Sequence, residues 1–311
     1  MPYIAKIVIC AYHTVGYRCL QELLAQGAQI LAVFTHEDSP SEEIWFESVR
    51  ELALSHQIPC YTTDVNLPGN VELLRTLAPD FLFSFYYRSM IKKEVLDLFC
   101  RGSLNLHGSL LPKYRGRVPV NWAVIQGESE TGATLHYMVE KPDAGDIVDQ
   151  ERVSIEFTET SLDIFRKVAD AAVRVLARSW PQLLAGTARR LPMDLAAGSY
   201  YGGRKPADGL IDWRKSSTEI YNLIRGVTHP YPGAFTYLAG KKVYIWGATP
   251  GPGKGRAGEV LSEKPLLVGT GSGTLEVLSL QFEREKEINA LTFVRENPVL
   301  GKSFSSFQKS E

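Results

Sequence analysis

Two polar side chains, Asn105 and His107, end an apolar run in the first half of the sequence, and a third, Asp143, follows a later run. Side chains alternate along a strand, so Asn105 and His107 are expected on one face. An amide can donate to a developing oxyanion, an imidazole can move a proton, and a carboxylate can orient and charge-stabilise that imidazole. The trio therefore indicates a transferase-like or hydrolase-like site of unknown substrate.

Each of these residues also has an ordinary structural interpretation. An Asn-x-His strand end is frequently plain hydrogen-bonded structure, and Asp143 sits in a Pro-Asp-Ala-Gly sequence typical of turns. Pro142 and Gly145 frame that turn, which predicts that Asp143 is exposed. Residue types and spacing alone leave both interpretations open.

Three basic residues follow His107, and they fit either a solvent-exposed surface or a phosphate-binding site. They are Lys113, Arg115 and Arg117. The chain has no G-x-x-x-x-G-K, no G-x-G-x-x-G after its first strand and no G-x-S-x-G. A nucleotide phosphate loop and a hydrolase elbow are therefore not supported.

The elements that would position these residues alternate between short apolar runs and helical patterns. The expected strands cover residues 7–9, 30–34, 81–85, 103–106 and 133–139, and the expected helices cover residues 16–25, 45–55, 90–99 and 161–184. Such alternation predicts an α/β fold with a mainly parallel sheet and helices on both faces. Ligands in such sheets bind beyond the carboxyl ends of the strands.

A second pattern begins near residue 200. Residues 190–207 have little periodicity and contain several glycines, which predicts a linker. Short β-like runs separated by Gly-rich turns then predict a small β-barrel. The expected organisation is an N-terminal catalytic domain (1–189), a linker (190–207), a C-terminal barrel (208–305) and a tail (306–311).

The composition sets limits on partners and location. The chain has 311 residues, 44% hydrophobic and 22% charged, with a formal net charge of -1, which argues mildly against a large nucleic-acid partner. Its four scattered cysteines form no zinc-ligand pattern, so no metal is expected. We find no signal peptide and no apolar run of membrane-spanning length, and we expect cytoplasmic residence.

The run from Asn105 to Gly116, NLHGSLLPKYRG, resembles the signature of the 10-formyltetrahydrofolate-dependent formyltransferases, and Asp143 falls where that family keeps its aspartate. The resemblance implies a Rossmann-like core with an OB-like C-terminal barrel. It implies that Asn105, His107 and Asp143 are catalytic. 10-Formyltetrahydrofolate would be the cosubstrate, and its formyl group would pass to an amine.

The resemblance also assigns binding residues. For the folate it implies Ser89, Met90, Ile91, Arg117, Val139, Glu140, Lys141, Pro142 and Asp143. For the acceptor substrate it implies Tyr12, Tyr86, Arg115 and Arg204. Arg204 lies in the linker, where its relatives have two adjacent arginines, and position 203 is glycine here. An arginine there suits a diphosphate, although a plain linker fits as well.

Further segments, such as Phe83–Arg88 and Pro230–Phe235, resemble the branch of the family found in bifunctional polymyxin-resistance proteins. That branch formylates UDP-4-amino-4-deoxy-L-arabinose for lipid A modification. The main alternative is methionyl-tRNA formyltransferase, which carries a basic loop after the second strand. Here residues 37–43 are acidic, and carboxylates repel phosphate, which favours a small sugar nucleotide.

Two further alternatives remain open. Water could replace the amine, which would make the chain a formyltetrahydrofolate hydrolase. The bifunctional relatives continue into an NAD-dependent decarboxylase, whereas this sequence stops at Glu311. We therefore expect either a stand-alone enzyme, with a homo-oligomer or a separate decarboxylase as partner, or a piece of a longer chain.

Overall fold

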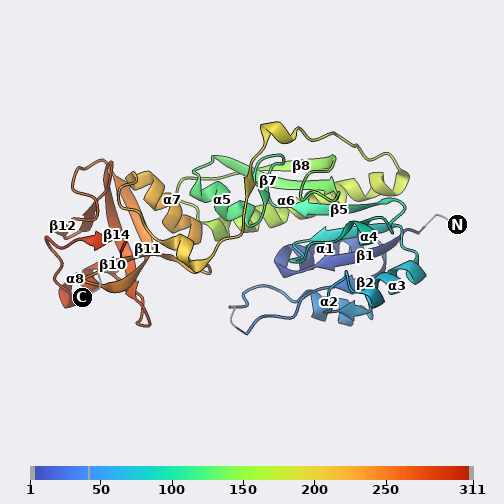
Figure 1. Ribbon diagram of the computed structural model, residues 1–311, viewed down its shortest axis with the longest axis horizontal. Helices are drawn as coiled ribbons and strands as arrows, with labels where there is room; N and C mark the ends of the chain where they lie inside the picture. The colour runs from blue at the N-terminus through green and yellow to red at the C-terminus, as the bar shows by residue number, and fades with distance from the viewer. Residues whose placement is uncertain (1–3, 41–42, 308–311) are drawn as a thin grey trace. The chain divides into compact units, whose positions relative to one another are not determined.

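The computed structural model describes residues 4–40 and 43–307 and contains two compact units (Figure 1). The first unit comprises Met1–Pro119, Glu130–Ser154 and Phe165–Gly202, and the second comprises Val120–Ser129, Ile155–Ile164 and Gly203–Glu311. Two short segments that interrupt the first unit in sequence thus belong to the second unit. The domain limits expected from the sequence, at residues 189, 207 and 305, stay predictions.

The first unit is built on a seven-stranded sheet in the order β3-β2-β1-β4-β5-β7-β8. The strands are β1 (Lys6–Ala11), β2 (Gln29–Phe34), β3 (Cys60–Tyr61), β4 (Phe81–Phe85), β5 (Gly102–His107), β7 (Glu130–Tyr137) and β8 (Ile147–Ser154). The pairs among β1 to β5 are parallel, whereas β7 is antiparallel to both β5 and β8. This arrangement confirms the predicted mainly parallel sheet.

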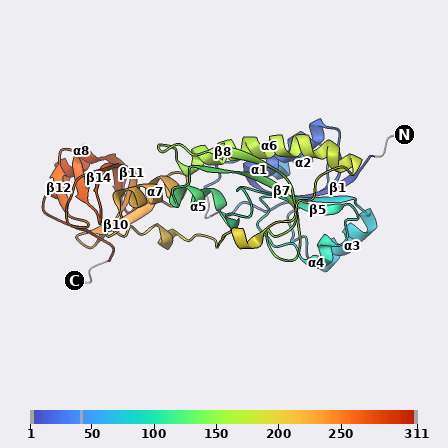
Figure 2. The ribbon, with the colours of Figure 1, turned by 90° about the horizontal axis from the view of Figure 1, so that it is seen from above.

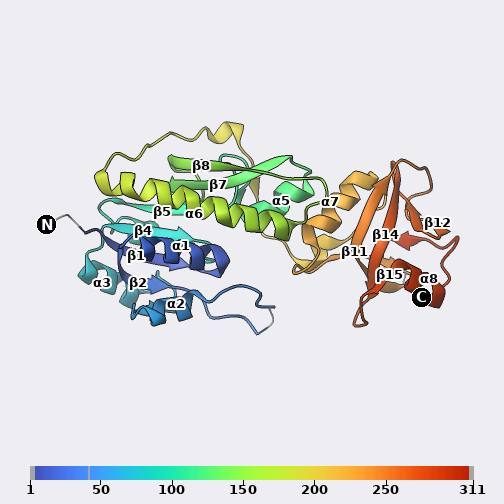
Figure 3. The same cartoon turned by 180° about the vertical axis from the view of Figure 1, so that it is seen from behind.

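Helices cover both faces of this sheet, as predicted. α1 (His13–Ala25) and α6 (Ser161–Ala185) lie on one face, while α3 (Pro68–Leu77) and α4 (Lys93–Leu96) lie on the other (Figures 2 and 3). Burial on both faces explains why β1 and β4 are apolar at nearly every position. All five residues of β4 are buried.

Two helices are shorter than the sequence predicts. The helix expected over residues 45–55 is α2 (Val49–Ser55), because Ser48 caps it by accepting a hydrogen bond from Glu51 N–H. The helix expected over residues 90–99 is α4 alone, because Asn66 binds the backbone before it through Met90 O and Lys92 N–H. In both cases a polar side chain satisfies backbone groups that a longer helix would have used.

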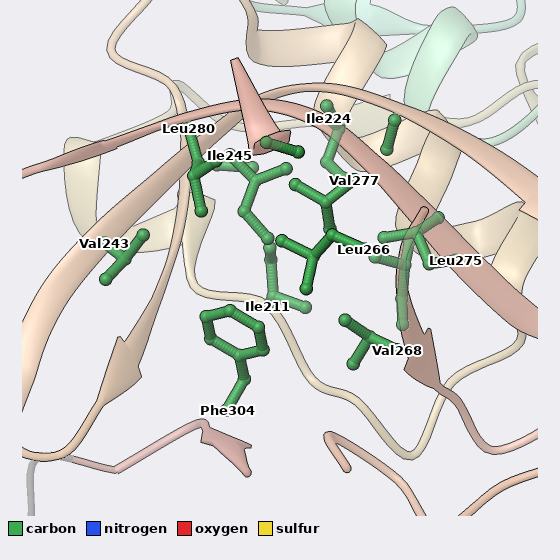
Figure 4. Packing of buried hydrophobic residues seen from close by; sticks show 14 of the residues in the cluster. Ile211, Ile224, Val243, Ile245, Leu266, Val268, Leu275, Val277, Leu280 and Phe304 are labelled. Carbon is green, nitrogen blue, oxygen red and sulfur yellow. The ribbon is translucent and has the colours of Figure 1, made fainter. Parts of the chain in front are cut away.

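The second unit contains an antiparallel sheet in the order β12-β13-β14-β11-β10-β16, with β15 paired to β14. Its strands are β10 (Ala234–Leu238), β11 (Lys241–Gly251), β12 (Val260–Glu263), β13 (Leu266–Gly269), β14 (Thr274–Phe282), β15 (Ile288–Asn289) and β16 (Phe304–Ser305). The sheet curls around one core, in which Val243, Ile245 and Val277 converge with Ile224 of α7 (Ser217–Val227) (Figure 4). This confirms the predicted small barrel-like domain.

In the described part of the chain, none of the helices is long and apolar enough to cross a membrane. Within the same residues, no group of three or more His, Cys, Asp or Glu side chains is arranged to hold a metal ion.

Candidate active site

The carboxyl ends of β1, β4 and β5 form one edge of the first unit's sheet. Ser84 pairs with Asn105 across β4 and β5, so these strands run in register to the edge where β5 ends at His107. Tyr12 and Tyr86 directly follow β1 and β4 at the same edge, and Tyr12 N–H donates to Phe85 O. The edge is therefore where a ligand of an α/β sheet is expected.

Asn105 lies at the centre of a polar cluster at this edge. Its Nδ2 lies 3.1 Å from His136 Nε2 and donates to Asp143 Oδ1 at 3.3 Å. An amide nitrogen carries two N–H donors, so both can be used in this arrangement. Asn105 therefore links the strand end to the loop that carries Asp143, and the catalytic roles predicted for these two residues stay predictions.

His107 is buried beside the same carboxylate. Its Nε2 lies 2.8 Å from Tyr114 O, and a carbonyl only accepts, so Nε2 carries the hydrogen. Its Nδ1 lies 3.6 Å from Asp143 Oδ1. With Nε2 committed to a backbone carbonyl, Nδ1 is the ring atom that can gain or lose a proton, and the carboxylate faces that atom.

Asp143 is more enclosed than the sequence predicts. Its side chain is only 12% exposed, because the loop folds back so that Asp143 Oδ2 accepts a hydrogen bond from Gly116 N–H at 2.9 Å. Burial acts to raise the pKa of this carboxyl. The charge of His107, the contacts with His136 and the Gly116 N–H outweigh that effect and hold the pKa well below its usual range. The expectation of an exposed turn was wrong, and Asp143 is a buried, ionised group.

His136 on β7 is a member of the cluster that the sequence did not reveal. It is 1% exposed, and its Nδ1 donates to Tyr137 O at 2.8 Å. Its Nε2 accepts from Asn105 when the ring is neutral, or donates to Asp143 Oδ1, 3.4 Å away, when the ring is protonated. The signal that could have found it is the antiparallel register, in which His136 stands directly opposite Asn105.

The residues predicted to bind the folate flank this cluster in sequence and differ in exposure. Met90 is 58% exposed and Val139 is 46% exposed, whereas Ile91 is buried. Glu140 and Lys141 are exposed, and Ser89 and Pro142 are half-buried. Arg117 is exposed, and its Nη2 donates to Arg88 O. Val139 and Glu140 also line a cavity of about 390 Å³ with Tyr137 and Arg190.

Tyr12 lines a second cavity of about 650 Å³. Tyr12 donates through its hydroxyl to Asp38 at 2.6 Å, and the guanidinium of Arg88 lies over its ring. The cavity is also lined by His36 and Glu37. Burial lowers the pKa of His36, and the charge of Arg88 lowers it further. Within the acidic segment 37–43, Ser41 and Glu42 lie outside the described residues.

Tyr86 contacts the signature segment directly. Its hydroxyl oxygen would lie 2.2 Å from a Cβ placed on Gly108, so a residue larger than glycine at position 108 would displace the phenol. Tyr86 is half-buried and adopts a left-handed backbone with a φ of 56°. Gly108 therefore makes room for the Tyr86 side chain beside His107.

The two arginines predicted to bind the acceptor differ in their surroundings. Arg115 belongs to the first unit and is only 8% exposed. Arg204 belongs to the second unit, stacks over Trp122 and donates through Nη2 to Asp208 O at 2.8 Å. Burial lowers the pKa of Arg204. The structure thus gives Arg204 partners of its own within the second unit.

The sequence as a whole matches a known family. Residues 13–179 match the family described as formyl transferase, and residues 204–298 match the C-terminal domain of formyl transferases. The chain belongs to the formyl transferase family. Each of the two compact units therefore contains a sequence match to a domain of this family.

Solved structures of low sequence identity share the fold of this formyl transferase. An N-formyltransferase from Helicobacter canadensis, solved with folinic acid and dTDP-3-aminofucose, is 19% identical, with 88% of this chain and 99% of that chain covered and a TM-score of 0.68. A 4-N formyltransferase from Francisella tularensis is 22% identical, with a TM-score of 0.61. The match covers 73% of this chain and 89% of that chain. HypX from Aquifex aeolicus, solved with tetrahydrofolic acid, is 19% identical, with a TM-score of 0.63. The match covers 99% of this chain and 50% of the HypX chain.

Four residues in the segments that carry the predicted site of this formyl transferase have a left-handed backbone. Tyr86, Tyr114, Val118 and Asp143 all have positive φ values although none is glycine. Val118, with a φ of 49°, is the most unfavourable, since a β-branched side chain crowds this conformation. Strain of this kind persists only where the surroundings over-determine the backbone, and it is typical of functional sites.

Proposed function

We propose that this formyl transferase moves the formyl group of 10-formyltetrahydrofolate onto the amine of a nucleotide-linked amino sugar, with UDP-4-amino-4-deoxy-L-arabinose as the acceptor. The observation that carries the proposal is the cluster of Asn105, His107, His136 and Asp143 at the sheet edge where α/β folds bind ligands. The Helicobacter canadensis relative, solved with folinic acid and dTDP-3-aminofucose, supports both ligand classes.

The residues beside the cluster fit the chemistry of a folate. Met90 and Val139 expose apolar side chains that a pteridine or benzoyl ring can cover. Arg117 provides a solvent-accessible guanidinium suited to a carboxylate, such as the one on the glutamate of a folate. When bound, 10-formyltetrahydrofolate would supply an electrophilic formyl carbon.

Asn105 would stabilise the negative charge that builds on the formyl oxygen. Both of its N–H groups have partners in the present arrangement, at 3.1 Å to His136 and 3.3 Å to Asp143. The proposal therefore requires that the longer bond be exchanged for the formyl oxygen. His136 would keep the amide group in its orientation during that exchange.

As the amine nitrogen forms its bond to the formyl carbon, His107 would accept the proton that the amine loses through Nδ1, and it would pass that proton to N10 of the folate as the bond from N10 to the formyl carbon breaks and tetrahydrofolate leaves. The bond from Nε2 to Tyr114 O fixes the tautomer that leaves Nδ1 free to accept. Asp143 stays ionised at neutral pH, because its pKa is held low, and it lies 3.6 Å from the nitrogen that becomes charged. Its charge would stabilise the imidazolium, as the aspartate does in hydrolase triads.

Three observations bear on the identity of the acceptor. One relative was solved with dTDP-3-aminofucose, and another is described as a 4-N formyltransferase. The position of the amine on the acceptor sugar therefore has to be tested. Glu37, Asp38 and Glu43 make the segment after β2 acidic, which disfavours a tRNA backbone. With this acceptor the enzyme would act in the cytoplasm, in lipid A modification and polymyxin resistance.

A panel of acceptors tests the proposal. The purified chain is incubated with 10-formyltetrahydrofolate and, separately, UDP-4-amino-4-deoxy-L-arabinose, dTDP-3-aminofucose, methionyl-tRNA or no amine. We expect formylated product with the first acceptor and little formate release without an amine. Product with methionyl-tRNA alone would establish the tRNA alternative, and rapid formate release without an amine would establish the hydrolase. Asn105→Ala serves as the inactive control.

A further inference from the structure

Arg115, in the short strand β6 (Arg115–Gly116), is a buried cation for which the described residues supply no partner. The residue is 8% exposed, and its Nε is fully enclosed without a hydrogen-bond partner. Its main chain is bonded normally, since its N–H donates to Ser199 O. Among the described side chains no carboxylate lies within ion-pair distance of its guanidinium. The Nε of Arg115 is therefore enclosed without a partner, and its guanidinium has no counter-charge in this part of the chain.

An enclosed cation without a counter-charge is costly, and buried charges in proteins are normally paired. An arginine guanidinium carries five N–H donors and no acceptor, so only an acceptor or an anion can satisfy it. Its terminal nitrogens are not among the fully enclosed atoms, so a ligand can reach them. The planar fork of a guanidinium matches the paired oxygens of a phosphate or a carboxylate.

The backbone on either side of Arg115 holds two members of the polar cluster. Tyr114 O accepts the hydrogen bond from His107 Nε2, and Gly116 N–H donates to Asp143 Oδ2. Tyr114 and Gly116 both have positive φ values, at 58° and 101°. A three-residue segment thus sets the orientation of His107 and Asp143, and the side chain of its central residue is Arg115.

We propose that Arg115 binds a phosphate of the acceptor's diphosphate, and that this contact holds the segment Tyr114–Gly116 in the conformation that orients His107 and Asp143. The inference rests on the proposed function and assigns Arg115 two effects, on substrate binding and on the geometry of the site. An acceptor that carries a diphosphate would thereby hold His107 and Asp143 in their catalytic orientation, whereas an amine without a phosphate would not.

The surroundings of β6 favour a phosphate over a folate carboxylate. β6 pairs in parallel with β9 (Tyr200–Tyr201), and Arg117 N–H donates to Tyr201 O. The carboxylate of the folate already has a proposed partner in the exposed Arg117, and Met90 and Val139 expose apolar groups for its rings, which leaves the phosphate of the acceptor for Arg115.

The test compares Arg115→Met and Arg115→Lys with Lys6→Met, a control that removes an exposed charge at the amino end of β1. Thermal shifts are measured without ligand and with UDP, dTDP, inorganic pyrophosphate or folinic acid. Formylation of UDP-4-amino-4-deoxy-L-arabinose gives kcat and KM. We expect Arg115→Met to weaken UDP binding by about 10- to 100-fold, since bonds to charged groups are among the stronger ones. Its kcat should fall as well, while its folinic acid shift stays normal.

The ligand-free proteins give a second readout that a purely structural arginine would not produce. Removing an uncompensated charge should leave the melting temperature of Arg115→Met equal to or above that of the wild type. Arg115→Lys, which keeps the charge without the fork, should bind UDP with intermediate affinity. Lys6→Met should match the wild type in every measurement.

Each remaining outcome has a defined meaning. An unchanged UDP shift in Arg115→Met, or a large loss of its ligand-free stability, overturns the inference. Loss of the folinic acid shift alone shows a carboxylate ligand and overturns the phosphate assignment. If the wild type formylates no sugar nucleotide but its pyrophosphate shift still depends on Arg115, the anion site stands and the proposed function falls.

Discussion

Asn105 on β5 stands directly opposite His136 on β7, and its amide nitrogen lies 3.1 Å from the Nε2 of that histidine. Because His136 Nδ1 donates to Tyr137 O, the neutral ring presents a lone pair to the amide. The two side chains come from antiparallel strands that the sheet holds in register. The orientation of Asn105 is therefore set by a buried neighbour before any ligand binds.

His136→Phe should lower kcat by about 10-fold or more, because Asn105 loses the acceptor that orients it. His136→Gln, whose carbonyl oxygen can still accept, should recover part of the loss. The measurement is steady-state formylation with each variant, and kcat should change more than KM. The exposed His56 offers a control as His56→Gln, which should behave as wild type. Equal activity of the Phe and Gln variants would mean that His136 only fills space.

Asn105→Ala should lower kcat by about 10²–10³-fold, the usual cost of removing one oxyanion donor. Folinic acid should still shift its melting temperature, since the proposed role concerns charge that builds during the reaction. The half-buried Asn70 on α3 provides the comparison as Asn70→Ala, which should keep full activity. Retention of more than a tenth of the wild-type kcat would remove Asn105 from the role proposed for it.

Much of this arrangement could be predicted from the sequence. Side-chain alternation along a strand placed Asn105 and His107 on one face, and the alternation of strands and helices gave the parallel sheet that ends there. The family signature supplied the link to Asp143, which lies 36 residues after His107 in the numbering and within 3.6 Å of it in space. Local periodicity and a long motif were sufficient for these conclusions.

The rest depends on contacts that no local pattern encodes. His136 joins the cluster only because β7 runs antiparallel to β5, and the strand register is not written in either segment alone. The sequence predicts that Asp143 lies in an exposed turn. Its side chain is instead largely enclosed, because Gly116 N–H, which belongs to another segment, donates a hydrogen bond to it. The uncompensated charge of Arg115 likewise appears only once its surroundings are known.

The stability of the protein should depend on pH through Asp143. Its pKa is lower in the folded state than the ordinary value of about 3.9, so its stabilising contribution is present above that value and is lost as the pH falls below it. Asp143→Asn should therefore be less stable than wild type at pH 7, by about 1–3 kcal/mol, and the difference should shrink below about pH 4.

Urea unfolding of both proteins between pH 3 and pH 7 measures this difference. Asp97→Asn is the control, because Asp97 is an exposed carboxylate that pairs with Lys93 on the surface and should give a small difference. A gap between Asp143→Asn and wild type that stays constant over the whole range would contradict the depressed pKa. The amide also cannot stabilise a charged His107, so kcat should fall by roughly 10²–10⁴-fold at neutral pH.

The last prediction concerns the space between Gly108 and Tyr86. Gly108→Ala places a Cβ 2.2 Å from the Tyr86 hydroxyl oxygen, so the phenol must move. Because Gly108 directly follows His107, we expect activity to fall by about 10-fold or more, since small displacements in an active site are costly. The double variant Gly108→Ala with Tyr86→Phe removes the clashing atom, and the next contacts, at 3.3 Å and 3.5 Å, can be accommodated. It should be more active than Gly108→Ala alone, with Tyr86→Phe as the reference. A double variant no better than Gly108→Ala would show that the glycine is needed for its backbone and not for the room it leaves Tyr86.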